Sequence, residues 1–312
     1  MSPPWSRVHI MSIDSSSRPA VTRDEVPARF DLLPDHRFQV AVVTGGGGGI
    51  GRAVSHGLAS AGYCVAILGR CMEDLSETAR GNPRIAPYCL DVGDAERSAA
   101  VFAEVERRMG PVDILVANAA VYPRVHFLDQ SPASFEDTFQ TNVHGVANAV
   151  RSVLPGMLSR NAGRIIVLGS LADQSPLAGA CAYSASKGAL HALVRGIAAE
   201  VDRVRYPNVL MNEFNPGQTR TAMSGDGQPP EAVYPLIQAL IDQPPGGAHG
   251  RMFVRDHESR TNERLTRAIL HRIGIGPRLM RLAPREQNHR SRVNPEDVTY
   301  RDSTPISCRR LH

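Results

Sequence analysis

A tyrosine and a lysine four residues apart are the side chains in this sequence best suited to chemistry. They are Tyr183 and Lys187 of the stretch YSASK, and Lys187 is the only lysine among the 35 Lys and Arg residues. A tyrosine with its ordinary pKa of about 10 is a poor acid or base at neutral pH. If 182–204 is a helix, both side chains share one face, and the ammonium would stabilise the phenolate and lower its pKa. The pair therefore predicts general acid–base catalysis by Tyr183, at a point that arginine's planar fork cannot occupy in the same way.

The glycine-rich run TGGGGGIG, from Thr44 to Gly51, is a second candidate site. An apolar stretch precedes it and a stretch with helical apolar spacing follows, so it lies where a strand gives way to a helix. A dinucleotide pyrophosphate needs a tight turn, a close backbone approach and helix N–H groups at such a point. Gly45, Gly49 and Gly51 meet that need, and we predict a dinucleotide cofactor. The alternative is a polyglycine loop without a strand before it or a helix after it.

The end of the next strand indicates which dinucleotide binds. An acid there would bond the ribose 2′-hydroxyl of NAD, but the strand ends at Gly69 and Arg70 follows. A carboxylate would repel a 2′-phosphate and an arginine would bind it, so we predict NADP(H), with NAD(H) as the alternative. The alternative role of Arg70 is a solvated surface charge.

Strands that alternate with helices are expected to position these residues. Short apolar runs predict strands at 39–45, 63–69, 85–91, 112–120, 163–170, 208–214 and 250–254, and helical spacing predicts helices that include 50–62, 94–109, 132–159 and 182–204. This alternation predicts right-handed βαβ units and an α/β fold of the Rossmann type, a doubly wound parallel sheet in a single domain with two extensions.

The domain is expected to span 39–257. Residues 1–38 are rich in Ser, Pro and Arg and predict a flexible N-terminal leader. Residues 258–312 predict a basic C-terminal extension, partly helical or disordered, with an amphipathic helix at 261–274.

Composition narrows the function classes. No stretch reaches 18 apolar residues and no secretory signal is evident, so we expect a cytoplasmic protein without a membrane span. A mitochondrial transit peptide within 1–23 is the alternative. The five cysteines are odd in number and lack metal-ligand spacing, which favours reduced thiols and no metal site.

The net charge of +4 is concentrated at the C-terminal end, where 12 arginines stand against 7 acids from Asp256 onward. Such a tail could dock an acidic carrier protein that holds the substrate, or it could be a solvated extension. Nucleic acid is not expected, because Tyr300 is the only aromatic residue in the tail. Abundant arginine and glycine suggest a GC-rich genome, and a role in secondary metabolism is a hypothesis built on that composition.

The motifs, taken in their order, resemble those of the classical short-chain dehydrogenase/reductase family over about 39–255. The matches are Thr44 to Gly51, Asp91 in LDV, Asn118 in ANAA, Asn142 in TNVHG, Ser170, Tyr183, Lys187, and Pro216-Gly217 followed by Thr219. The resemblance implies hydride transfer between NADP(H) and a ketone or secondary alcohol, without a metal. An NAD-dependent secondary alcohol dehydrogenase and a non-catalytic nucleotide-binding module are the alternatives.

The resemblance implies four catalytic residues: Asn142, Ser170, Tyr183 and Lys187. Ser170 would bond the substrate oxygen, or would only cap the next turn. The side chain of Asn142 would hold a water that relays protons behind Lys187, or would be a core amide bonded to backbone.

The resemblance also implies a set of cofactor contacts. They come from Thr44, Gly45, Gly49, Ile50, Gly51, Arg70, Asp91, Asn118, Lys187, Pro216, Gly217 and Thr219. Asp91 would contact the adenine. Thr219 would bond the nicotinamide carboxamide, or would be a turn hydroxyl.

Three segments depart from the family pattern: ANAA at 117–120, the short stretch after Thr221, and the end VRDHESR. The short stretch predicts an open pocket or one completed by another segment. Loops 121–131, 171–182 and 221–235 are expected to set specificity for a small-molecule substrate. The helices 132–159 and 182–204 match those that pair subunits in the family, so a homodimer or homotetramer is expected.

Overall fold

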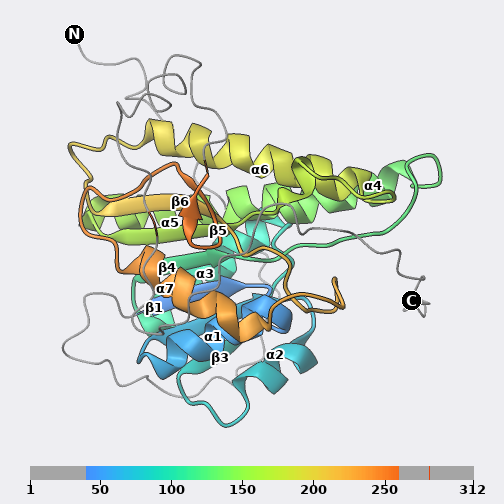
Figure 1. Cartoon of the computed structure of the whole chain (residues 1–312). Coiled ribbons are helices and arrows are strands. Elements are labelled where there is room, and N and C mark those ends of the chain that lie inside the picture. Colours follow the sequence, from blue (N-terminus) through green and yellow to red (C-terminus); the bar gives the residue numbers. More distant parts are fainter. Residues whose placement is uncertain (1–39, 260–280, 282–312) are drawn as a thin grey trace, which may run out of the picture.

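Eight strands form one sheet in the computed structural model, which describes residues 40–259 and residue 281 (Figure 1). The strand order is β3-β2-β1-β4-β5-β6-β7-β8, and every pairing is parallel except that of β7 with β8. The strands are β1 (Val40–Thr44), β2 (Cys64–Gly69), β3 (Ile85–Cys89), β4 (Val112–Ala117), β5 (Gly163–Leu168), β6 (Val209–Asn215), β7 (Met252–Val254) and β8 (His257–Glu258). The predicted doubly wound α/β fold is confirmed.

Helices cover both faces of the sheet, as Figure 1 shows with α6 and α4 on one side and α1 and α7 on the other. The α-helices are α1 (Gly49–Ser60), α2 (Met72–Ala79), α3 (Ala95–Met109), α4 (Pro132–Phe139), α5 (Gly145–Arg160), α6 (Cys181–Glu200) and α7 (Tyr234–Ile241). Side chains of α3, α5 and α6 pack with one face of the strands, and those of α1, α2 and α7 pack with the other. Burial on both faces explains why most of the strand sequences are largely apolar instead of alternating between apolar and polar residues.

The predicted helix at 132–159 is not one regular α-helix. Between α4 and α5 the turn Gln140–His144 is a π-helix, η1, and it contains the buried Asn142. An extra residue in such a turn re-aims the side chains that it carries, and such turns are frequent at functional sites. The apolar spacing is continuous across the insertion, so the pattern alone does not reveal it.

The strand predicted at 112–120 ends earlier, at Ala117. The next two backbone amides turn away from the ladder and donate to the Thr44 hydroxyl instead. A further difference is α7, which the sequence analysis did not predict and which follows the 3₁₀ turn η3 (Pro230–Val233).

The last strand, β8, crosses the expected domain end at residue 257. Beyond it, Arg281 donates to the carboxylate of Asp256 over 3.0 Å. The expected leader at 1–38, the helix at 261–274 and nearly all of the basic extension lie outside the described residues.

The two middle strands, β1 and β4, are neighbours, but the chain leaves them toward opposite edges of the sheet. Ligands of such sheets bind outside the carboxyl ends of the strands at this switch point. The glycine run follows β1 and Asn118 follows β4, so both lie at that point. Within residues 40–259, no helix combines the length and the apolar character needed to cross a membrane.

Candidate active site

The glycine loop between β1 and α1 leaves no room for a side chain at Gly45 or Gly51. The φ angle of Gly45 is 67°, in the region that favours glycine. A Cβ on Gly51 would lie 2.1 Å from the carbonyl oxygen of Gly45 and 2.7 Å from Nδ2 of Asn118. The first turn of α1 therefore packs directly on the loop, with its free N–H groups at the carboxyl edge of the sheet. This cradle fits a dinucleotide pyrophosphate.

The loop is fastened to β4 by Thr44 and Asn118. The hydroxyl of Thr44 accepts hydrogen bonds from the amides of Asn118 and Ala119, each over 3.0 Å. In return, Nδ2 of Asn118 donates to the carbonyl oxygens of Thr44 and Gly45 over 3.0 and 3.2 Å. Both predicted cofactor residues thus hold the shape of the switch point.

Ile50 and Gly49 lie where α1 begins, as expected. Gly49 has a φ of 50°, and a Cβ on it would lie 3.1 Å from Cγ2 of Thr221. The glycine loop and the segment after Pro216 therefore face each other, although they are far apart in the sequence.

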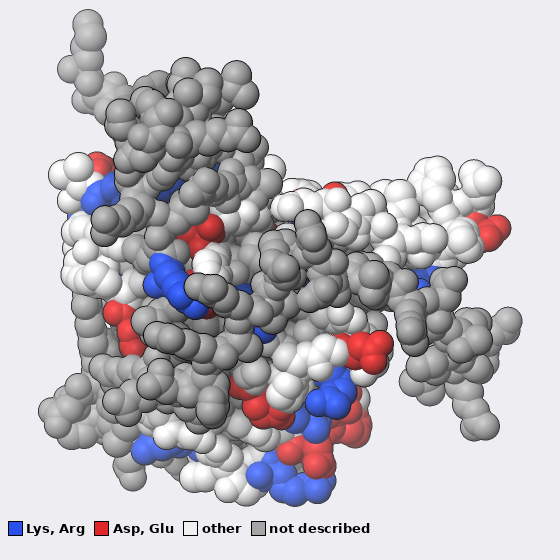
Figure 2. Space-filling view, in the orientation of Figure 1, with Lys and Arg blue, Asp and Glu red and all other residues white. Residues whose placement is uncertain are grey.

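Arg70 is exposed at the end of β2, directly before α2. It forms no ion pair with another residue of the described part of the chain. Acids Glu73 and Asp74 occupy the first turn of α2, and Figure 2 shows acidic and basic side chains mixed over the lower part of the molecule. Arg70 is thus available to a phosphate at the rim of the site. Asp91, also exposed, accepts from the amide of Gly93 over 2.9 Å and shapes the turn after β3.

Arg52 of α1 is a contributor that the sequence analysis missed. Its guanidinium donates to the carbonyl oxygen of Gly47 over 2.6 Å and to the hydroxyl of Thr78 over 2.9 Å. It therefore ties the glycine loop to α2. Its position directly after the glycine motif was the available signal.

Ser170, Tyr183 and Lys187 meet at the same edge of the sheet. Ser170 follows β5, and its hydroxyl accepts from the amide of Ala172 over 3.1 Å, so it does cap the next turn. The Ser170 side chain is also near enough to Tyr183 to act on the pKa of its phenol. Nζ of Lys187 lies 5.7 Å from the centroid of the Tyr183 ring and donates to the carbonyl oxygen of Leu168 over 2.8 Å.

The expected lowering of the Tyr183 pKa is wrong for this structure. Burial raises the pKa of the phenol, the Ser170 side chain opposes that rise, and nearby Tyr122 adds to it. Sequence spacing reveals the neighbouring lysine but not the loss of water around the phenol. Burial also lowers the pKa of Lys187 to about 8, while Glu213 opposes that change.

Asn142 is fully buried, and both polar atoms of its side chain have protein partners. Its Oδ1 accepts from the amide of Val121 over 2.8 Å, and its Nδ2 donates to the carbonyl oxygen of Val121 and to the hydroxyl of Ser186. Ser186 in turn donates to the carbonyl oxygen of Tyr183. The geometry favours the core-amide interpretation of this side chain, which links the π turn to α6 behind the tyrosine.

The segment Pro216, Gly217 and Thr219 follows β6 and folds back on itself. Gln228 Nε2 donates to the carbonyl oxygen of Pro216 over 2.8 Å. The hydroxyl of Thr219 donates to the carbonyl oxygen of Gly217 over 3.2 Å. Thr219 is therefore a turn hydroxyl here, and only 5% of it is exposed. The short stretch after Thr221 is followed by η3 and α7, and Tyr234 of α7 packs against Gly57 of α1.

Two of the expected specificity loops contact each other, and one of them contacts Tyr183. The amide of Val125 donates to the carbonyl oxygen of Gly179 over 2.9 Å, joining the loops at 121–131 and 171–182. Tyr122 places its ring 4.5 Å from that of Tyr183, measured between centroids. An aromatic wall thus adjoins the phenol, and this contact was not predicted.

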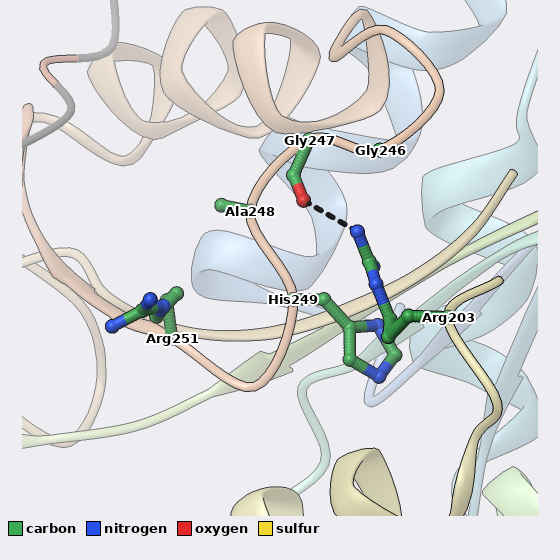
Figure 3. A pocket seen from close by; sticks show the side chains of 6 residues that line it. All are labelled: Arg203, Gly246, Gly247, Ala248, His249 and Arg251. Atoms are coloured by element: carbon green, nitrogen blue, oxygen red, sulfur yellow. Dashed lines mark hydrogen bonds between the residues drawn. The ribbon is translucent and has the colours of Figure 1, made fainter. Parts of the chain in front are cut away.

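A pocket of about 270 Å³ lies elsewhere, lined by Arg203, Gly246, Gly247, Ala248, His249 and Arg251 (Figure 3). These residues precede β6 and β7, so the pocket lies at the amino edge of the sheet. Arg203 donates to the carbonyl oxygen of Gly247 over 3.0 Å, whereas Arg251 points away from that pair. The pocket is separate from the candidate active site.

Comparison with known proteins identifies the family. The sequence model of the family described as short chain dehydrogenase matches residues 39–232, so the chain belongs to this family. It is therefore an NAD(P)-dependent oxidoreductase that acts on CH–OH or C=O groups.

Relatives in this family include named reductases. Acetoacetyl-CoA reductase of Shinella zoogloeoides is 33% identical over 68% of this chain and 85% of its own length. L-xylulose reductase of Mus musculus is 34% identical over 59% of this chain and 72% of its own. A solved structure titled short chain dehydrogenase/reductase family protein superposes with a TM-score of 0.63 and 30% identity, over 69% of this chain and 94% of that one.

Proposed function

We propose that the protein is an NADP(H)-dependent reductase of a ketone, or dehydrogenase of the corresponding secondary alcohol, with Tyr183 as the general acid or base. The observation that carries the proposal is the meeting of Ser170, Tyr183 and Lys187 beside the glycine cradle. The two relatives named as reductases support the reductive direction.

The residues have complementary tasks in a reduction. When bound, the nicotinamide cofactor would supply a hydride for the carbonyl carbon. The hydroxyls of Ser170 and Tyr183 donate hydrogen bonds to the carbonyl oxygen, where negative charge develops. Tyr183 then gives its proton to that oxygen. Its raised pKa keeps the phenol protonated at neutral pH, which suits an acid better than a base.

Lys187 supplies the positive charge behind the phenol. Once Tyr183 has lost its proton, the ammonium stabilises the phenolate that remains. Its hydrogen bond to the Leu168 carbonyl oxygen holds it at the end of β5. Asn142 keeps α6 and the π turn in register, so that the tyrosine faces Ser170.

NADP(H) is proposed over NAD(H) because of Arg70. Its guanidinium would hold the 2′-phosphate, and the strand end before it carries no acid. Thr44, Gly45, Gly49, Ile50, Gly51 and Asn118 would form the pyrophosphate cradle, with Asp91 near the adenine and Lys187, Pro216, Gly217 and Thr219 near the nicotinamide end.

The substrate and the assembly are finer parts of the same proposal. Tyr122 offers a ring surface for a small carbonyl compound, free or bound to a carrier protein. A homodimer or homotetramer follows from the family resemblance of the helical layer, and sedimentation of the purified protein tests it.

The test begins with titration of the purified protein with NADPH and NADH, followed by nicotinamide fluorescence. A panel of ketones and β-ketoacyl thioesters is then added to the NADPH complex. We expect tighter NADPH binding and oxidation of NADPH by at least one ketone. Tyr183→Phe should bind NADPH as the wild type does and lose about 10²- to 10⁴-fold in kcat. Absence of binding, or an active Tyr183→Phe enzyme, would overturn the proposal.

A further inference from the structure

A buried acid and a histidine lie directly behind Lys187. Glu213 of β6 is 1% exposed, and its Oε2 lies 2.9 Å from Nδ1 of His191. His191 is four residues after Lys187 on α6, so Tyr183, Lys187 and His191 follow one another along one side of that helix. Helix α6 packs against β6, which brings these side chains over the carboxylate.

The absence of a side chain at Gly169 leaves space for the Glu213 carboxylate beside the end of β5. A Cβ on Gly169 would lie 2.2 Å from Oε1 of Glu213. The carboxylate therefore occupies the space between Leu168, which accepts from Lys187, and Ser170. A buried charge is costly unless it is paired, so the Glu213 carboxylate needs a partner, and His191 supplies one.

Three ionisable side chains act on Glu213, and they come from two elements. His191 and Lys187 of α6 favour its ionised form, while Asp173 of the 3₁₀ turn η2 (Leu171–Asp173) disfavours it. Burial raises the pKa of the Glu213 carboxyl, and the hydrogen bond with His191 is the largest effect that opposes this rise. Conversely, Glu213 is the group that raises the pKa of Lys187 against burial.

We propose that Glu213 and His191 are positioning residues for Lys187. Glu213 keeps the buried lysine in its charged ammonium form, and His191 keeps Glu213 in its ionised form. This inference rests on the proposed function for its catalytic meaning, because the ammonium is what stabilises the Tyr183 phenolate. The charge interactions themselves involve Lys187, Glu213 and His191 and do not depend on the reaction.

The proposal fixes the direction in which each substitution should move the pKa of Lys187. Loss of the carboxylate charge should make the ammonium release its proton at lower pH. Loss of the histidine should have the same effect, but a smaller one, since a less ionised Glu213 remains. In a chain that already lacks the Glu213 charge, the histidine should have no further effect.

A single-signal titration can test this without cofactor or substrate. Because Lys187 is the only lysine, protein isotope-labelled at lysine Cε gives one lysine resonance. We expect the wild-type resonance to titrate at about pH 8. Glu213→Gln should lower that midpoint by about one pH unit. His191→Asn should lower it by less, and the double variant should match Glu213→Gln alone.

Glu200→Gln is the matched control, because Glu200 is an exposed carboxylate at the other end of the same helix. Its midpoint should equal that of the wild type. If Glu213→Gln fails to fold, His191→Asn still tests the proposal. An unchanged or raised midpoint in Glu213→Gln, or in His191→Asn alone, would overturn it.

Activity then separates this inference from the proposed function. In an active enzyme, the alkaline limb of the kcat profile should move to lower pH by the same amount as the lysine midpoint. A wild type that reduces no ketone would defeat the proposed function and leave the titration intact. An active enzyme whose lysine midpoint ignores Glu213 would defeat the inference alone.

Discussion

Lys187 is fastened to the end of β5: its Nζ donates a 2.8 Å hydrogen bond to the carbonyl oxygen of Leu168. The same ammonium is 4% exposed, so the fold holds a charge almost without water. A buried charge of this kind destabilises the folded state, and we expect it to be kept because it serves catalysis. Stability and activity should therefore respond in opposite directions when the charge is removed.

Lys187→Met should raise stability near neutral pH while abolishing turnover. The folded-state pKa of about 8 lies below the ordinary 10.5, so the unfolded chain binds more protons between these values. Wild-type stability should therefore rise as the pH increases from 8, by up to about 3 kcal/mol across the window, and stay at its lower level below 8. Urea unfolding between pH 7 and 9.5 measures this slope. Equal slopes for wild type and variant would contradict the prediction.

Arg70→Gln should weaken NADPH binding by about 10- to 100-fold, because a charge-assisted hydrogen bond to the 2′-phosphate is lost. NADH has no such phosphate, and its affinity should stay the same. Fluorescence titration of both cofactors measures the difference. Arg97→Gln is the control, since Arg97 is an exposed arginine on α3. A parallel loss of NADH affinity would assign Arg70 a structural role instead.

Gly51→Ala should lower the melting temperature and remove cofactor binding. The added Cβ would lie 2.1 Å from the Gly45 carbonyl oxygen, a backbone atom that cannot swing aside. Such overpacking costs about 1–3 kcal/mol. Gly48→Ala is the matched change in the same loop, where a Cβ meets nothing within 4 Å and φ is −164°. Its melting temperature should stay near that of the wild type; a similar drop in both would argue against the close-approach explanation.

Asn142→Ala should destabilise the protein by about 2 kcal/mol, since the backbone groups of Val121 lose their side-chain partners in a buried setting. Asn142→Asp keeps the acceptor for the Val121 amide but loses the donor to Ser186. It should also destabilise, because it adds a buried charge. Chemical denaturation of both variants measures these effects. Wild-type stability in either one would contradict the anchoring role.

Local patterns predicted the fold because most strands are largely apolar, and the glycine run, Arg70 and Asn118 each directly follow a strand. TGGGGGIG and Arg70 could be placed at the carboxyl edge before any coordinates, since parallel strands bring their ends to one edge. The π turn at Gln140–His144 could not, because inserting one residue leaves the apolar spacing of a long helix almost unchanged.

The finer parts of the site depend on contacts between distant elements. The spacing of Tyr183 and Lys187 indicates their proximity but not the burial that raises the phenol pKa. Glu213 was visible as a lone acid in an apolar strand, and His191 as the residue one turn beyond Lys187. Only the packing of α6 on β6 shows that the two belong together.

The close contact between Gly169 and Glu213 limits how these two positions can change during evolution. Because a Cβ at 169 would lie 2.2 Å from Oε1 of Glu213, a side chain at 169 requires that the carboxylate moves or that position 213 first becomes smaller. The reverse order passes through an ancestor in which both groups compete for one space. Substitutions at the two positions are therefore expected to be correlated rather than independent.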